Sequence, residues 1–108
     1  MQTSEINWTE VEQEVAQQAF KTANFREINS LIQYSAQKIA EIKNIEDLWQ
    51  LNDFLNARRH DIAGKYEYQL SSLIFIFADL LKEGWLSIDD LAGLGSEKLT
   101  KISLLSRM

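Results

Sequence analysis

The chain has 108 residues, of which 45% are hydrophobic and 25% are charged, and its formal net charge at pH 7 is −5. This length fits one small domain, and the composition excludes a disordered chain. The negative charge argues against general binding to nucleic acid, and the absence of cysteine excludes disulfides and thiolate chemistry.

The N-terminal half is expected to form long helices, because residues 1–63 contain neither proline nor glycine. The segment TEVE at 9–12 has the form of a capping box, with Thr9 as N-cap and Glu12 at the third helical position. A first helix is expected from about 10 to about 22. A break is expected at 22–24, where the residues are poorer helix formers.

The segment from 25 to 42 carries the clearest helical pattern. Its apolar residues recur at alternating steps of three and four, interrupted once by Ser35, which is typical of a coiled-coil seam. Such a seam needs a facing helix. This could be the same helix of a second copy of the chain, or the first helix folded back against the seam in an intrachain hairpin. The first helix is short and its apolar face is rich in alanine, so the pattern favours self-association. The seam residues are Phe25, Ile28, Ile32, Ile39 and Ile42.

Residues 44–63 form the next helical segment. Asn44 can cap a new helix, or the preceding helix can continue through it. A continuous helix would extend the seam to Glu46, Trp49, Asp53, Asn56 and His60. A second stripe lies on another side and is expected to hold the C-terminal part, with Gly64 ending the helix. This stripe comprises Leu48, Leu51, Leu55 and Ile62.

The C-terminal part reads as three further helices. One is expected at 66–83, stopped by Gly84, and a short one from Ser87 to about Leu91 begins with a second capping-box sequence, SIDD. Ser96 is expected to cap a last helix, and no stretch alternates like a strand. The predicted fold is all-α, within a single domain over 1–108. Extended helices occupy about 9–63, and a compact helical head occupies about 64–108.

The residue types needed for catalysis are scarce. There is one histidine and no Gly-rich phosphate loop, so no catalytic constellation is apparent. His60 and Asp61 point about 100° apart on a helix, which disfavours a metal site. Asp89 and Asp90 suit a helix start. We therefore expect neither an enzyme nor a bound cofactor or metal.

Two aromatic residues lie off the predicted core stripes and indicate binding. Phe75 lies about 150° from the core face of its helix, so it points outward unless the final helix covers it. Trp49 shares a face with Asn52 and Asp53, with Arg59 near its edge. Tryptophan and arginine are enriched in interface hot spots. Alternatively, Trp49 packs at the base of a dimer seam, and Asp53 and Arg59 form an ordinary ion pair.

The stretch 46–86, EDLWQLNDFLNARRHDIAGKYEYQLSSLIFIFADLLKEGWL, resembles the cyanobacterial fluorescence recovery protein family. The resemblance rests on the D-L-W-x-L-x-D-F-L-x-A-x-R-H core, the G-K-Y turn and the I-F-x-F-A-x-L-L-x-E-G run. Residues 1–45 resemble the family only in helical character.

The resemblance implies an all-helical, usually dimeric, non-enzymatic regulator. Such proteins bind the C-terminal domain of the photoactivated red form of orange carotenoid protein. They speed its return to the orange form and its detachment from the phycobilisome, which ends non-photochemical quenching. The alternative is a structural or scaffolding dimer with no role in photoprotection.

The family's functional positions fall on Trp49, Asp53, Arg59, Phe75 and Lys101. Asn52 stands where the family motif has a histidine, which puts a pH-dependent role of that position in doubt. The seam from Phe25 to Ile42 falls where the family's dimer helix would be.

The location expected from the sequence is the cytoplasm, and a peripheral position on the cytoplasmic face of the thylakoid membrane is compatible with it. No basic segment followed by an apolar run opens the chain, so no secretory signal is expected. The longest apolar run, LIFIFA at 73–78, is too short to cross a bilayer.

Overall fold

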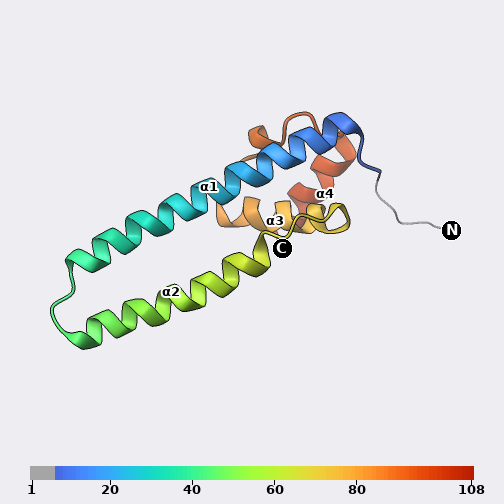
Figure 1. Cartoon of the computed structure of the whole chain (residues 1–108). Helices are drawn as coiled ribbons and strands as arrows, with labels where there is room; N and C mark the ends of the chain where they lie inside the picture. Colours follow the sequence, from blue (N-terminus) through green and yellow to red (C-terminus); the bar gives the residue numbers. More distant parts are fainter. Residues whose placement is uncertain (1–6) are drawn as a thin grey trace. The chain divides into compact units, whose positions relative to one another are not determined.

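A computed structural model describes residues 7–108, and Figure 1 shows them as helices joined by short connections. The predicted all-α class is confirmed, since no strand occurs between 7 and 108 beyond an isolated bridge of Ala92 with Leu94. Within the same range no helix is both long and apolar enough to cross a membrane. The elements in chain order are α1 (Glu10–Ala40), α2 (Ile45–Lys65), the 3-10 helix η1 (Leu70–Ser72), α3 (Leu73–Glu83), the 3-10 helix η2 (Ile88–Leu91) and α4 (Ser96–Ser106).

α1 is one uninterrupted helix of 31 residues, so the predicted break at 22–24 is wrong. Ala23 is fully buried there, and packing outweighs the few tenths of a kcal/mol by which its neighbours disfavour a helix. The predicted start is confirmed. The backbone N–H of Glu12 donates to Thr9 Oγ1, and the N–H of Thr9 donates to Glu12 Oε1. This reciprocal pair is a capping box.

α2 is a separate helix, because Asn44 caps it and its side chain accepts the N–H of Asp47 at 2.9 Å. The seam therefore does not pass from Ile42 to Trp49 along one helix. The predicted stop at Gly64 is also wrong, since the helix includes Gly64 and ends at Lys65. Gly64 does not adopt the positive φ of a helix-ending glycine. The presence of a glycine at this position was therefore not a sign of a helix end.

The C-terminal elements follow the prediction in part. α3 begins at Leu73 and not at 66, and Tyr68 in the preceding segment packs edge-on against Phe20 with ring centroids 5.3 Å apart. Gly84 ends α3 with φ 88°, as predicted. The N–H of Ser87 donates to Asp90 Oδ2, which confirms the second capping box, although the turn is a 3-10 helix. Gly95 and not Ser96 occupies the N-cap of α4.

The chain divides into two compact units. The first comprises Met1–Asn24 with Tyr68–Met108, and the second comprises Phe25–Glu67. In the first unit α3 packs against α4, and the largest fully buried apolar side chains are Phe77, Leu73, Leu80, Leu91 and Ile102. In the second unit only Glu27 and Leu51 are buried. Of the predicted leucine stripe on α2, therefore, only Leu51 is buried. The predicted division of the chain into extended helices over about 9–63 and a helical head over about 64–108 stays a prediction.

A buried carboxylate links the first turn of α1 to the start of α4 within the first unit. Glu12 Oε2 accepts the N–H of Gly95 at 2.8 Å, and Glu12 Oε1 accepts from Lys98 Nζ at 3.1 Å. The hydrogen bonds from the Gly95 and Thr9 amides lower the pKa of Glu12 from 4.5 to about 2, against the effect of burial. Lys98 Nζ also lies 5.1 Å from the centroid of the Trp8 ring. Ionised Glu12 is therefore part of the folded state at neutral pH.

The pH dependence of folding tests this link. Because the folded pKa of Glu12 lies below its ordinary value, its contribution is fully present above about pH 4.5 and is lost as the pH falls toward about 2. Glu12→Gln should lower the free energy of unfolding by about 1–3 kcal/mol at pH 7 and by less at pH 3, in urea titrations followed by circular dichroism. Glu14→Gln, at an exposed position of the same helix, is the matched control. A loss that is equal at both pH values would contradict the assignment.

Candidate functional site

One face of α2 carries exposed polar and aromatic side chains. Steps of three and four residues place them on one side of the helix. Trp49 keeps 52% of its surface exposed, which leaves a large apolar ring in water. Asp53 and Arg59 form no ion pair with each other or with any other residue in the range 7–108, so the ordinary ion pair considered from sequence is absent there. The outer face of α2 comprises Trp49, Asn52, Asp53, Asn56 and Arg59.

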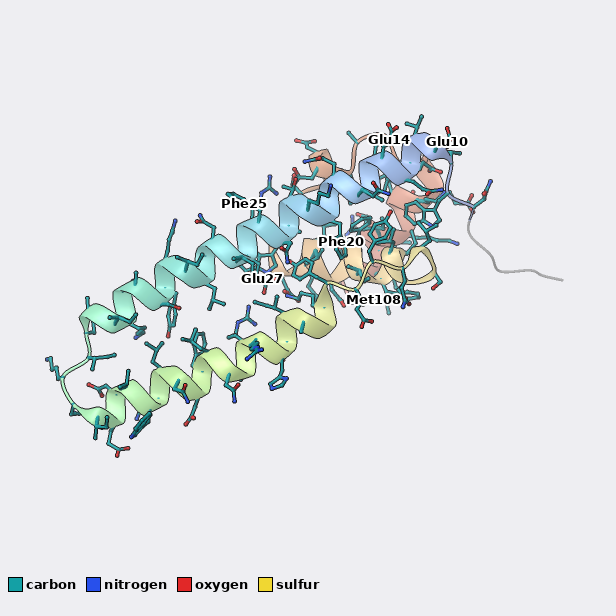
Figure 2. The ribbon with its side chains drawn as sticks, in the orientation of Figure 1. Glu10, Glu14, Phe20, Phe25, Glu27 and Met108 are labelled. Atoms are coloured by element: carbon teal, nitrogen blue, oxygen red, sulfur yellow. The ribbon has the colours of Figure 1, made fainter. Side chains whose placement is uncertain are left out.

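The side of α2 that faces α1 is organised by a buried carboxylate, which we call the Glu27 cluster: Glu27, Arg58, Lys65 and Tyr66. Glu27 lies on α1 and is 1% exposed. Its carboxylate accepts hydrogen bonds from Arg58 Nη2, from Lys65 Nζ at 3.0 and 3.1 Å, and from Tyr66 Oη at 2.8 Å. Figure 2 shows Glu27 pointing from α1 toward α2, whereas Phe25 lies on the other side of α1.

The electrostatics of the Glu27 cluster keep the carboxylate charged. Burial raises its pKa and is the largest single influence. The hydrogen bonds from Lys65, Tyr66 and Arg58 together outweigh burial and hold the pKa of Glu27 below its ordinary value. Arg58 also lies 3.7 Å from the exposed carboxylate of Asp61. Two acids and two bases thus balance one another in this part of the second unit.

The predicted seam on α1 is exposed along part of its length. Phe25, Ile32 and Ile39 are 69%, 61% and 60% exposed. They are seven residues apart and therefore follow one line along the helix. Ile28 and Ile42 are half-buried. The folded-back first helix considered from sequence is excluded, because residues 10–40 form a single helix. Self-association along this row stays a prediction.

A second apolar surface lies between α3 and α4 in the first unit. Phe75 is 61% exposed, so the prediction that it points outward is confirmed and the alternative that α4 covers it is wrong. Lys101, which the resemblance assigns to partner binding, is exposed and lines the same surface, and its role in binding stays a prediction. The surface is a groove of about 340 Å³, which we call the α3–α4 groove, lined by Ser71, Ile74, Phe75, Lys101, Leu104 and Leu105.

Sequence reasoning missed Leu104, which is 55% exposed beside Phe75. Ile102, two positions earlier, is fully buried, and two positions on a helix correspond to about 200°. Leu104 is therefore a leucine off the core stripe of α4. A large apolar residue off the core stripe is the pattern that identified Phe75, and the same pattern in the sequence could have identified Leu104.

Groups that could bind a metal ion are dispersed in the described structure. No three His, Cys, Asp or Glu side chains between residues 7 and 108 gather closely enough to hold one. Asp61 pairs with Arg58, and His60 is exposed on α2. The surfaces described above instead present aromatic, aliphatic and cationic groups. The described chain is therefore an all-helical protein whose exposed surfaces carry residue types that are enriched in protein–protein interfaces.

Comparison with known proteins identifies the family. A family model described as photoprotection regulator fluorescence recovery protein matches residues 8–106, a far longer span than the motifs at 46–86. The fluorescence recovery protein of Synechocystis sp. is 41% identical over 108 residues, covering 100% of this chain and 99% of the relative. The chain belongs to the fluorescence recovery protein family of photoprotection regulators.

Solved structures of the family have the same fold. The structure of the Fremyella diplosiphon fluorescence recovery protein aligns with a TM-score of 0.91 at 54% identity, covering 94% of this chain and 100% of that one. The structure from Synechocystis sp. PCC 6803 aligns with a TM-score of 0.90 at 40% identity and the same coverage. The likeness therefore includes α1, where sequence motifs were weak.

Two phenylalanines of α3 offer a matched test of the groove. Phe75→Ala truncates an exposed side chain and should change the free energy of unfolding by about 1 kcal/mol or less. Phe77→Ala truncates a fully buried one and should cost about 3–5 kcal/mol. Urea unfolding followed by circular dichroism measures both. If Phe75→Ala costs as much as Phe77→Ala, Phe75 belongs to the core and not to a binding surface.

Proposed function

We propose that this protein is a non-enzymatic regulator that binds the photoactivated red form of orange carotenoid protein through its C-terminal domain. It speeds the return of that protein to the orange form and its detachment from the phycobilisome, which ends non-photochemical quenching. It acts in the cytoplasm, where a position at the cytoplasmic face of the thylakoid membrane brings it to the phycobilisome. The observation that carries the proposal is membership of the photoprotection regulator family over residues 8–106.

The exposed surfaces support a role in recognition. Trp49 offers a large apolar area with one hydrogen-bond donor, and Arg59 offers a planar fork for a carboxylate or a carbonyl. Phe75 and Leu104 line an apolar groove. Lys101 lines the same groove and adds a compact positive charge. The residues assigned to partner binding are Trp49, Asn52, Asp53, Arg59, Phe75, Lys101 and, added from the groove, Leu104.

The mechanism follows from differential binding. A ligand shifts a conformational equilibrium only as far as it prefers one state, so the regulator must bind the states of its partner unequally. To accelerate the reversion it must also bind the reclosing geometry more tightly than the open form. Two binding surfaces on one chain can each engage a different part of the partner, which lowers the entropic cost of bringing those parts together.

The exposed row on α1 supports pairing with a second copy of the chain. Three large apolar side chains in heptad register are expensive to leave in water. Pairing along the row would bury them, and it would add to the sparse apolar burial of the second unit. The proposed dimer seam comprises Phe25, Ile28, Ile32, Ile39 and Ile42.

A charge on the row tests the dimer. Ile32→Glu should convert the dimer to a monomer in size-exclusion chromatography with light scattering, because a carboxylate in an apolar seam loses its hydration. Gln33→Glu adds the same charge at an exposed position about 100° away and should leave the dimer intact. A dimer that persists in Ile32→Glu at the same concentration would refute the seam.

The regulatory function is tested by following the red-to-orange absorbance change of purified carotenoid protein in the dark. The wild-type protein should accelerate the change. Arg59→Ala should weaken binding to the red form by about 10- to 30-fold, as expected for a hot spot, which is measured as the rise in the protein concentration that gives half of the maximal acceleration. Lys21→Ala removes one positive charge at an exposed position outside the assigned surfaces and serves as the control. An unchanged reversion rate with wild-type protein would refute the proposal.

The same assay distinguishes the regulator from the alternative, a scaffolding dimer. The exposed row on α1, taken by itself, is compatible with that alternative as well. If the reversion rate in every variant follows the dimer mass alone, the surfaces on α2 and in the α3–α4 groove are not binding sites. The regulator proposal requires that Arg59→Ala lose activity while it remains dimeric.

A further inference from the structure

α2 contains two adjacent arginines in opposite environments. Arg58 is half-buried and binds the carboxylate of Glu27. Arg59 is exposed, and it forms no ion pair with the part of the chain that the structure describes. The two side chains are chemically identical and point about 100° apart on the helix. The rotation of α2 about its own axis therefore decides which arginine is available to a partner.

Few apolar contacts fix that rotation. Leu51 is the one buried residue of α2, and Leu55 and Ile62 are half-buried. Near the middle of α2, Phe54 meets Tyr34 with ring centroids 5.0 Å apart, and both rings remain more than a third exposed. Apolar contacts of this kind are non-directional and tolerate some rotation of the helix. A different contact must define the orientation of the second half of α2.

The Glu27 cluster supplies that directional contact. Arg58 and Lys65 are seven residues apart, which places them on the same side of α2, two turns from each other. Both bind one carboxylate that is 1% exposed and anchored on α1. Hydrogen bonds to a fixed acceptor depend steeply on angle, so two of them spaced two turns apart resist rotation of the helix. Tyr66, just after the helix, adds a third donor.

Removal of the charge would take from Arg58 and Lys65 the buried anion that both bind, and would leave Arg58 beside the exposed carboxylate of Asp61. The repulsion between the two cations and their need for water would favour a rotation that exposes Arg58. A rotation that carries Arg58 to the exposed position of Ala57, about 100° away, would turn Asn52, Asn56 and Arg59 away from their present outward positions. The loss of a single buried charge would thus change the composition of the surface that a partner meets.

We propose that Glu27 is a positioning residue for partner recognition. By binding Arg58 and Lys65 it holds α2 so that Arg59, Asn52 and Asn56 face outward, and it leaves Arg59 as the one guanidinium of the pair that can bind a carboxylate or carbonyl of the partner. This inference rests on the proposed function for the identity of the partner, and on the structure alone for the orientation of α2.

A double-mutant cycle tests the coupling between Glu27 and Arg59. Glu27→Gln keeps the shape of the side chain and removes its charge. It should weaken binding to red carotenoid protein by about 10-fold, and Arg59→Ala should then add less than about 3-fold in the Glu27→Gln background, compared with at least about 10-fold in wild type. Losses that multiply independently would overturn the proposal.

Asp61→Asn is the matched control for the cycle. It removes the same charge from the other carboxylate that Arg58 contacts, but that carboxylate is 66% exposed and lies on α2 itself. It should change binding by less than about 2-fold. An effect of Asp61→Asn as large as that of Glu27→Gln would show that net charge, and not the anchor on α1, controls binding, and would overturn the proposal.

A second measurement needs no partner. Because the chain has no cysteine, a single cysteine at position 52 or 56 can carry a nitroxide spin label. Glu27→Gln should lower the accessibility of these labels to a water-soluble nickel complex by about 2-fold or more, as outward positions turn toward the protein. Asp61→Asn should not. Unchanged accessibility in Glu27→Gln, with helicity retained, would refute the orienting role.

The two experiments separate this inference from the proposed function. Failure of wild-type protein to bind red carotenoid protein contradicts the proposed function and, with it, the role of Glu27 in recognition. The spin labels then still decide whether Glu27 orients α2. Normal binding by both wild type and Glu27→Gln contradicts only the inference about Glu27.

Discussion

The buried carboxylate of Glu27 is the contact on which the second unit of this protein depends. Between residues 25 and 67 only Glu27 and Leu51 are buried, so this pair of helices lacks a conventional apolar core. Between its two helices lies a charged cluster in which one acid accepts hydrogen bonds from Arg58, Lys65 and Tyr66. Buried ionic contacts add little net stability compared with apolar packing. Their hydrogen bonds depend on angle, and the proposal is that here they define the orientation of α2. A unit organised in this way keeps large apolar side chains available at its surface.

The first unit, in contrast, has an apolar core. α3 and α4 enclose a conventional core that includes Phe77, Leu80 and Ile102, and Glu12 ties the start of α1 to α4. This rigid support holds Phe75 and Leu104 at the surface, where they line a groove beside Lys101. In both units the candidate binding surface includes an exposed aromatic side chain that lies off the core stripe of its helix, Phe75 in the first unit and Trp49 in the second. The chain belongs to a family of photoprotection regulators, and the proposed role of these surfaces in recognition rests on that membership.

The features that could be predicted from sequence are those with local causes. The capping box at Thr9 and the stop at Gly84 depend on neighbours within a few residues. The cap at Asn44 and the outward position of Phe75 were alternatives left open by the sequence, and the structure decided them. The partners of Glu27 could not be predicted, because they lie 31 to 39 residues away along the chain. The continuity of α1 through 22–24 was missed for the same reason, since burial of Ala23 overrides local preference. The motif resemblance at 46–86 located most of the candidate site, but it gave no information on what orients it.

The central claim is that Glu27 immobilises Arg58 and leaves Arg59 free, and nuclear magnetic resonance of the arginine guanidinium groups tests it most directly. In wild-type protein at neutral pH, Arg58 should show slow rotation about its Nε–Cζ bond and slow exchange of its side-chain protons with water. Arg59 should rotate and exchange rapidly, as an exposed guanidinium does. Glu27→Gln should make the two alike. Equal mobility of Arg58 and Arg59 in the wild-type protein would contradict the account.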